Sequence, residues 1–237
     1  MPRIEITDGV DPLLKVDLDK GEVFFAESNS MVAMDASLSL EGSARGGFLH
    51  SLSRKFLNDE SFFQEKISAD EGGSVLLTPL FPGDVRRLEI GSAQYCVSDG
   101  SYLANTEGVS FETITQSIGK ALFAKNSGLF ILKSKGEGGL FVSGFGSIRE
   151  IALDGSQEVI IDNGHLVAWD ASLKYTVSLS TAKQGFFGKL VNSQISGEGI
   201  VLRFKGKGKI LICSRNRGGF IDWIISKLPL VDSDNKN

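Results

Sequence analysis

The chain is poor in the residues that build several common kinds of site. Its 237 residues include two cysteines and two histidines, which excludes a disulfide framework and argues against a histidine metal cage. No apolar run reaches the roughly 20 residues that a membrane span needs, and the N-terminus lacks the apolar stretch of a secretory signal. The net charge of -4 is too small to indicate a polyanionic partner. We therefore expect a cytoplasmic globular protein in which Cys96 and Cys213 are buried small hydrophobes.

Glycine, in contrast, is abundant: 28 of the 237 residues are glycine, about 12% of the chain, against a usual share of about 7%. Glycine clusters separate short apolar runs that alternate or are rich in Val, Ile and Phe, a pattern typical of strands and tight turns. The sequence therefore predicts an all-β protein. Helical spacing of apolar residues predicts only short helices, near 48–56, 114–122 and 220–228.

The sequence also matches itself. Residues 31–38 (MVAMDASL) and 166–173 (LVAWDASL) are identical at six of eight positions, and a weaker copy lies at 103–109. Steps of 71 and 64 residues separate Ala33, Ala104 and Ala168. Because one copy alone would leave an apolar face uncovered, we predict three units that share a single core. This single domain comprises β units at about 4–79, 80–145 and 146–217, a C-terminal helix at 218–229 that packs over the end of the core, and a polar tail at 230–237.

Seven segments spread over nearly the whole chain carry a resemblance to a known family. They are MVAMD (31–35), GFLHSLSRKFLNDESFF (47–63), LTPLFPGD (77–84), YLANTEGV (102–109), GLFVSGFGSI (139–148), VIIDNGHLVAWD (159–170) and GIVLRFKGKGK (199–209). In order and spacing they resemble the altered-inheritance-of-mitochondria protein twenty-four family, which has many bacterial members of uncharacterised function.

This resemblance implies a fold similar to that of the trp RNA-binding attenuation protein, a β-sandwich or short double-stranded β-helix, which would be triplicated in this chain. Units of that fold associate into rings, so three units per chain and three chains would give a ring of nine. The resemblance supplies no catalytic residues. Eukaryotic relatives are linked to mitochondrial inner-membrane organisation, a role that does not carry over directly because we find no transit-like N-terminus.

The two histidines are the first candidates for acid–base chemistry. His165 follows Asp162 at a predicted turn, close enough to acidic residues to suggest a general base. The matching position in the first copy is Ser30, and no local motif marks a nucleophile. We therefore favour a structural or surface role for His165 and for His50.

Asp35 and Asp170 occupy matching places in the first and third copies, and a carboxylate pair is suited to metal binding or acid–base work. The middle copy has Thr106 at this place. Because Asp and Thr share the ability to hydrogen-bond the backbone, we favour a structural role at a strand end.

The densest basic segment suggests nucleic-acid binding, with Arg203, Lys205, Lys207 and Lys209 as candidates. Glycines between the lysines predict a hairpin tip, where lysines solvate a turn and guard a sheet edge. The segment also lacks the interleaved aromatic side chains that bind single strands. We therefore favour a solvated turn and expect no nucleic-acid partner, and we likewise interpret the glycine-rich stretches 136–139 and 144–146 as hairpin turns.

Two apolar segments are candidates for contact with a neighbouring subunit or a membrane surface. The candidate contact residues are Phe48, Leu52 and Phe56 in the segment 47–56, and Phe220 and Trp223 in the C-terminal helix, which we otherwise expect to pack over its own core. From these features we expect a non-enzymatic, ring-forming β scaffold without a cofactor. It would form a homotrimer and present a surface to a protein or membrane partner. A nucleic-acid- or small-ligand-binding module is the alternative, followed by a cupin-like metal enzyme.

Overall fold

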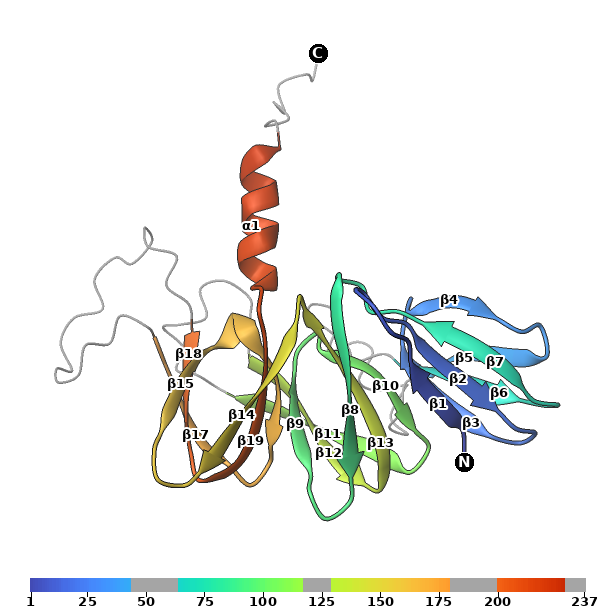
Figure 1. Ribbon diagram of the computed structural model, residues 1–237, viewed down its shortest axis with the longest axis horizontal. Helices are drawn as coiled ribbons and strands as arrows, with labels where there is room; N and C mark the ends of the chain where they lie inside the picture. The colour runs from blue at the N-terminus through green and yellow to red at the C-terminus, as the bar shows by residue number, and fades with distance from the viewer. Residues whose placement is uncertain (44–63, 117–128, 180–199, 229–237) are drawn as a thin grey trace, which may run out of the picture.

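The computed structural model describes residues 1–43, 64–116, 129–179 and 200–228 (Figure 1). The described chain is mostly β, with four antiparallel sheets, which confirms the predicted all-β class. The first sheet has the order β1 (Arg3–Ile6), β2 (Leu14–Leu18), β7 (Gly73–Leu77), β4 (Met31–Met34). The second has the order β5 (Leu38–Ser43), β6 (Gln64–Ala69), β3 (Val23–Glu27), β10 (Tyr102–Thr106), β13 (Gly138–Phe145), β8 (Gly83–Ile90). The third has the order β11 (Val109–Gln116), β12 (Leu129–Gly136), β9 (Tyr95–Ser98), β16 (Leu166–Asp170), β19 (Lys207–Cys213), β14 (Ile148–Asp154). The fourth has the order β15 (Val159–Asp162), β18 (Ile200–Lys205), β17 (Lys174–Leu179).

Three successive groups of six strands share one pairing scheme, and we call them the first (β2–β7), second (β8–β13) and third (β14–β19) units. In each unit the sixth strand pairs with the first and the third, and the fifth strand pairs with the second and the fourth. An irregularity interrupts the pairing of the third and sixth strands just before Ala33, Ala104 and Ala168. Each unit is thus a two-layered sandwich with a β-bulge at the same place.

Neighbouring units are joined by continuation of a sheet. The third strand of the second unit, β10, pairs with β3 of the first unit, with Ala104 opposite Ala26. In the same way β16 of the third unit pairs with β9 of the second, with Ala168 opposite Val97. We call these two contacts the internal joints. They place the three units in a row, blue to red in Figure 1.

The hydrophobic core has three clusters, and the joints make neighbouring units share them. Leu103 of the second unit packs in the first cluster, among Leu14, Phe24 and Val75 of the first unit. Val167 of the third unit packs in the second cluster, with Val97. A side chain also enters the cluster of the unit after its own, because Cys96 of the second unit packs in the third cluster. The side chains at each joint are therefore buried by both of the units that meet there.

The predicted helices have different outcomes. The segment near 48–56 lies outside the described residues. The helix predicted over 114–122 is wrong in its first part, because Val109–Gln116 form β11, paired with β12 over eight residues. Residues 117–128 are not described. Sheet pairing outweighed the four-residue spacing of Ile114 and its apolar neighbours.

The predicted C-terminal helix is present as α1 (Arg217–Lys227). Asn216 caps its start by accepting a hydrogen bond from the backbone N–H of Gly219. The prediction that α1 packs over the core is wrong, because the helix has no buried residue and projects away from the sheets (Figure 1). Its contact with the sheets runs through its first turn, where the rings of Phe220 and Phe145 lie 5.2 Å apart.

The glycine-rich turns are present, but they are not hairpins. Gly136 and Gly206 adopt positive φ angles of 92° and 114° at turns that lead from one sheet to the sheet facing it. Gly138, just after the first of these turns, has no room for a side chain, since a Cβ there would lie 2.2 Å from Oγ1 of Thr106. Consecutive strands at these places therefore face each other across the sandwich instead of pairing.

Candidate functional site

The basic segment predicted as a nucleic-acid candidate is neutralised in part by neighbouring carboxylates. Nη1 of Arg203 and Nζ of Lys205 lie 3.3 Å and 3.9 Å from oxygens of Glu158. Nζ of Lys209 lies 3.1 Å from Glu150, whose hydrogen bond and charge raise the pKa of the lysine. Lys207 begins β19. These ion pairs join partly exposed side chains and are typical of a solvated surface. A hollow of about 440 Å³ beside Lys205 is lined mainly by residues 155–158 and Lys174.

His165 supports the structural interpretation, and His50 lies outside the described residues. Nδ1 of His165 is 2.8 Å from the backbone carbonyl oxygen of Cys213, to which it donates a hydrogen bond. The ring thereby ties the short helix η1 (Asn163–His165) to the end of β19. Asp162 accepts a hydrogen bond from the N–H of Gly164 and so caps η1. His165 and the neighbouring Asp162 thus each bind backbone groups.

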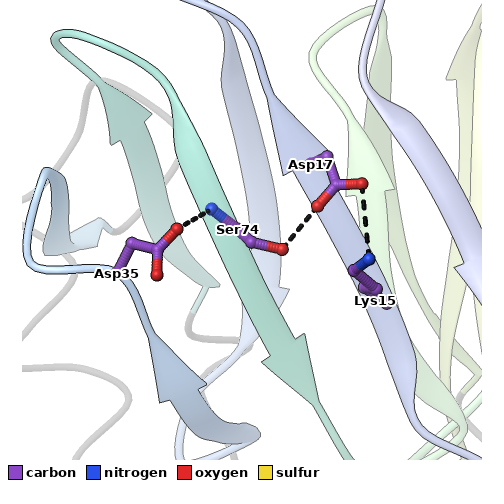
Figure 2. A network of polar contacts seen from close by, with 4 residues as sticks. All are labelled: Lys15, Asp17, Asp35 and Ser74. Carbon is purple, nitrogen blue, oxygen red and sulfur yellow. Dashed lines mark hydrogen bonds and ion pairs between the residues drawn. The ribbon is translucent and has the colours of Figure 1, made fainter.

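Asp35 also forms a hydrogen bond with a backbone group, as Figure 2 shows. Its Oδ2 accepts a hydrogen bond of 2.8 Å from the N–H of Ser74, and the Ser74 hydroxyl donates to Asp17 on the adjacent strand. This hydroxyl bond, the burial that partly opposes it, and Lys15 at 3.7 Å leave the pKa of Asp17 below its usual value. The network spans three neighbouring strands, β4's end, β7 and β2.

The counterparts of Asp35 act similarly. Thr106 Oγ1 accepts a hydrogen bond from the N–H of Gly139, which occupies the place of Ser74 in the second unit. Asp170 accepts one from the N–H of Ser172 in the following turn. The structural role predicted from the Asp and Thr exchange is therefore confirmed for these three positions. Among the described residues, no three histidine, cysteine or acidic side chains gather as a metal site.

The cysteines are buried and unpaired, as predicted. Burial raises the pKa of Cys96 to about 11, well above that of a reactive thiol. Of the predicted contact residues, Phe48, Leu52 and Phe56 lie outside the described residues. Phe220 and Trp223 are exposed on α1, and their contact with a partner stays a prediction. No helix in the described ranges is long and apolar enough to cross a bilayer.

The strand β4 forms an unusual sheet edge. Its residues Met31 and Val32 are 39% and 51% exposed. Their counterparts in the second unit, Tyr102 and Leu103, are 3% and 0% exposed. The difference arises because β10 continues the sheet of the preceding unit, whereas β4 is the last strand of the first sheet. The β4 edge therefore presents apolar side chains that the same scheme buries elsewhere.

The opposite end of the row has a matching edge at β15. Ile160 on this strand is 54% exposed. Its counterparts Phe25 and Cys96 are each 4% exposed, because β3 and β9 are continued by the next unit. β15 ends the fourth sheet. We call the free sides of β4 and β15 the terminal edges, and they are the candidate functional site.

The model of the family described as Mitochondrial biogenesis AIM24 matches residues 4–215 of this chain. The chain belongs to this family. The match runs from β1 to just beyond β19, so both terminal edges and both internal joints lie within the AIM24 region.

Two similar proteins come from Streptococcus pyogenes. This AIM24 chain is 35% identical over 224 residues to the uncharacterised protein M6_Spy0233 of serotype M6, covering 92% of this chain and 87% of that protein. The X-ray crystal structure of protein SPYM3_0169 superposes with a TM-score of 0.79 at 31% identity. That similarity covers 96% of this chain and all of the other.

The terminal edges were not identified from the sequence, although one signal was present. Residues Met31–Met34 form an uninterrupted apolar run, which is typical of a strand that is covered on both faces. In an edge strand of an isolated chain such a run is out of place, since edges are ordinarily protected by charge or proline. Combined with the internal repeat, this signal indicates a strand that lacks its neighbour.

Proposed function

We propose that this AIM24 chain is a non-enzymatic scaffold that self-associates into a closed ring and presents a surface to a protein or membrane partner. The observation that supports this most directly is the exposure of Val32 and Ile160 at places where their counterparts are buried. These two residues lie at the two ends of a row in which both internal joints pair the third strand of one unit with the second strand of the unit before it. A chain with two different, unfilled ends of this kind is suited to head-to-tail assembly.

Closure into a ring follows from the kind of contact. An interface between two unlike surfaces produces a ring if its rotation closes and a filament if it does not. We propose that three chains close a ring of nine units, in which each contact between chains repeats an internal joint. We also propose that the fold of the three units is similar to that of the ring-forming trp RNA-binding attenuation protein. The cytoplasmic location stays a prediction.

The proposed partner surface is α1, which projects from the third unit (Figure 1). Phe220, Ile221, Trp223, Ile224 and Ile225 are all exposed on this one helix, at 37–60% of their surface. Such a concentration of apolar residues marks an interaction site. In a three-chain ring related by rotation about one axis, three copies of α1 would project from the same face, which would multiply the binding of a partner through avidity.

Several contacts support a non-enzymatic role. His165, Asp35, Asp162 and Asp170, the side chains that resemble catalytic groups in the sequence, hold backbone groups at turns and strand ends. The ion pairs of the basic segment likewise give no support to nucleic-acid binding. Its charges are shared with carboxylates that would repel phosphates.

Electron microscopy of the purified full-length protein tests the proposal. We expect uniform closed particles with a threefold axis. Open filaments would overturn ring closure, whereas particles the size of one chain would overturn the scaffold itself.

A further inference from the structure

We infer that the partner of each terminal edge is a second copy of this chain, with β15 of one copy bound antiparallel to β4 of the next. This inference rests on the proposed scaffold and specifies the strands, the register and the side chains of its contact. It is derived from the two internal joints, which show how this chain already places one unit against another.

The register of the contact follows from the internal joints. At the first joint Ala104 lies opposite Ala26, and at the second Ala168 lies opposite Val97. Ala33 takes the place of these alanines on β4, because all three follow the same bulge. The residue on β15 that takes the place of Ala26 and Val97 is Ile161, as the matching pairing of β3 with β6 and of β15 with β18 shows.

Ile161 of one copy therefore lies opposite Ala33 of the next. One residue along, Ile160 lies opposite Met34, as Cys96 lies opposite Trp169 at the second internal joint. Each internal joint pairs three residues of one strand with three of the other, and the contact between copies has the same length.

The packing of the side chains points to the same contact. Leu103 enters the core cluster of the unit before its own, and so does Val167. By the same geometry Val32 enters the third cluster of the neighbouring copy, where Trp169 and Phe204 lie. Val32 is half exposed in the single chain, so this contact removes apolar surface from water.

Ile160 packs in the opposite direction, into the copy whose Val32 its own copy receives. Its counterpart Cys96 packs in the core cluster of the unit after its own. In the assembly Ile160 therefore reaches the first cluster of the next copy, against which Met34 already packs. Each copy thus gives one apolar side chain to its neighbour on either side, and the two exposed residues of the terminal edges become buried together.

The chemistry of the edges agrees with strand addition. The four residues of β4, Met31–Met34, include no charge and no proline, so nothing on this edge opposes pairing with another strand. Other sheet edges are open in every unit: β5, β11 and β17 are the corresponding end strands of three sheets. Among the described strands, only β4 and β15 form a sheet edge although their counterparts in both other units are interior strands. This distinction selects the terminal edges as the pair that meets.

Disulfide trapping in the full-length protein tests the register. We expect the double variant M34C/I160C to form covalent dimers and trimers under mild oxidation, because opposite residues of antiparallel strands have Cα atoms about 4.5–5.5 Å apart, within disulfide range. The native cysteines Cys96 and Cys213 are 4% and 7% exposed, so they do not compete. The control variant A33C/I160C shifts the register by one residue, which places the two thiols on opposite faces of the sheet.

The outcomes separate this inference from the proposed function. Covalent multimers from M34C/I160C, with at least ~10-fold less product from A33C/I160C and from either single cysteine variant, support the inferred contact. Equal cross-linking of the matched and shifted pairs overturns it, and so does no cross-linking in a protein whose native mass is that of an oligomer. In both of these cases the scaffold stands with a different interface. A monomeric native mass overturns both proposals.

Discussion

Val32 is 51% exposed, whereas Val167, the same residue type at the matching position of the third unit, has no exposed surface. The two valines occupy strands of the same kind, β4 and β16, each next to the same bulge. They differ in one respect, because β16 has β9 on its second side and β4 is the end of its sheet. A strand supplied by another copy would remove the difference.

A charged side chain at Val32 should abolish assembly. We expect V32D to raise the dissociation constant of the oligomer by at least ~100-fold, equivalent to about 3 kcal/mol, because the contact would bury an unpaired carboxylate. Size-exclusion chromatography with light scattering at micromolar concentration measures this effect. L80D is the matched control, since Leu80 is 81% exposed and lies outside both terminal edges. Loss of assembly in L80D as well, or none in V32D, would argue against the contact.

Glu27 should make the stability of the protein fall as the pH rises. Burial raises the pKa of this carboxyl from 4.5 to about 7, an effect that nearby Arg217 opposes and Asp99 reinforces. The native state then binds the proton more tightly than the unfolded state, so the stabilising contribution of Glu27 is fully present below pH 4.5 and is lost as the pH rises through 7. We expect E27Q, which mimics the neutral form, to raise the free energy of unfolding at pH 8 by up to about 3 kcal/mol.

Urea denaturation of wild type and E27Q at pH 5 and pH 8 measures the difference. The gain from the substitution should be large at pH 8 and small at pH 5. E41Q serves as the control because Glu41 is an exposed residue of β5. A gain in E27Q that is the same at both pH values would show that the buried charge is not its cause.

The hydrogen bond from Ser74 to Asp35 should stabilise the end of β4. We expect D35A to lower the free energy of unfolding by about 1 kcal/mol, because the N–H of Ser74 loses its acceptor. D35N retains an acceptor oxygen and should lose less than half as much. Chemical denaturation measures both, and equal losses from D35A and D35N would mean that the negative charge, and not the hydrogen bond, matters.

Much of the fold could be predicted because the sequence pattern reflects burial within the chain. The match of residues 31–38 to 166–173 aligned Ala33 with Ala168, and the structure places a bulge before each. The alternating apolar residues of 148–153 also predict a strand, and the structure has β14 there. Short strands with mixed composition, such as β9 with its cysteine and serine, were missed because their burial comes from neighbours distant in sequence.

The candidate site could not be predicted for a related reason. Met31–Met34 and Leu166–Trp169 have nearly the same apolar pattern, so the sequence does not distinguish an exposed strand from a buried one. Strand order decides the exposure, and it became visible only in the sheet topology. The orientation of α1 was missed because its apolar residues, Phe220 and Trp223 among them, indicate contact without specifying with what.

The two tryptophans should respond in opposite ways to truncation. Trp223 on α1 is 58% exposed, so we expect W223A to change the free energy of unfolding by less than about 0.5 kcal/mol. Trp169 is 1% exposed and contacts the rings of Tyr175 and Phe204, so W169A should lower it by about 3–5 kcal/mol. Urea denaturation measures both. A large loss in W223A would show that α1 packs on the β-sheets in solution and is not free for a partner.

The native mass of the full-length protein tests the central claim most directly. Light scattering on the wild-type protein at micromolar concentration should give about 77 kDa, three times the 25.5 kDa of one chain. That mass should persist on dilution, as expected for a closed ring in which every copy has two neighbours. A mass of 25.5 kDa at the same concentration would contradict the account.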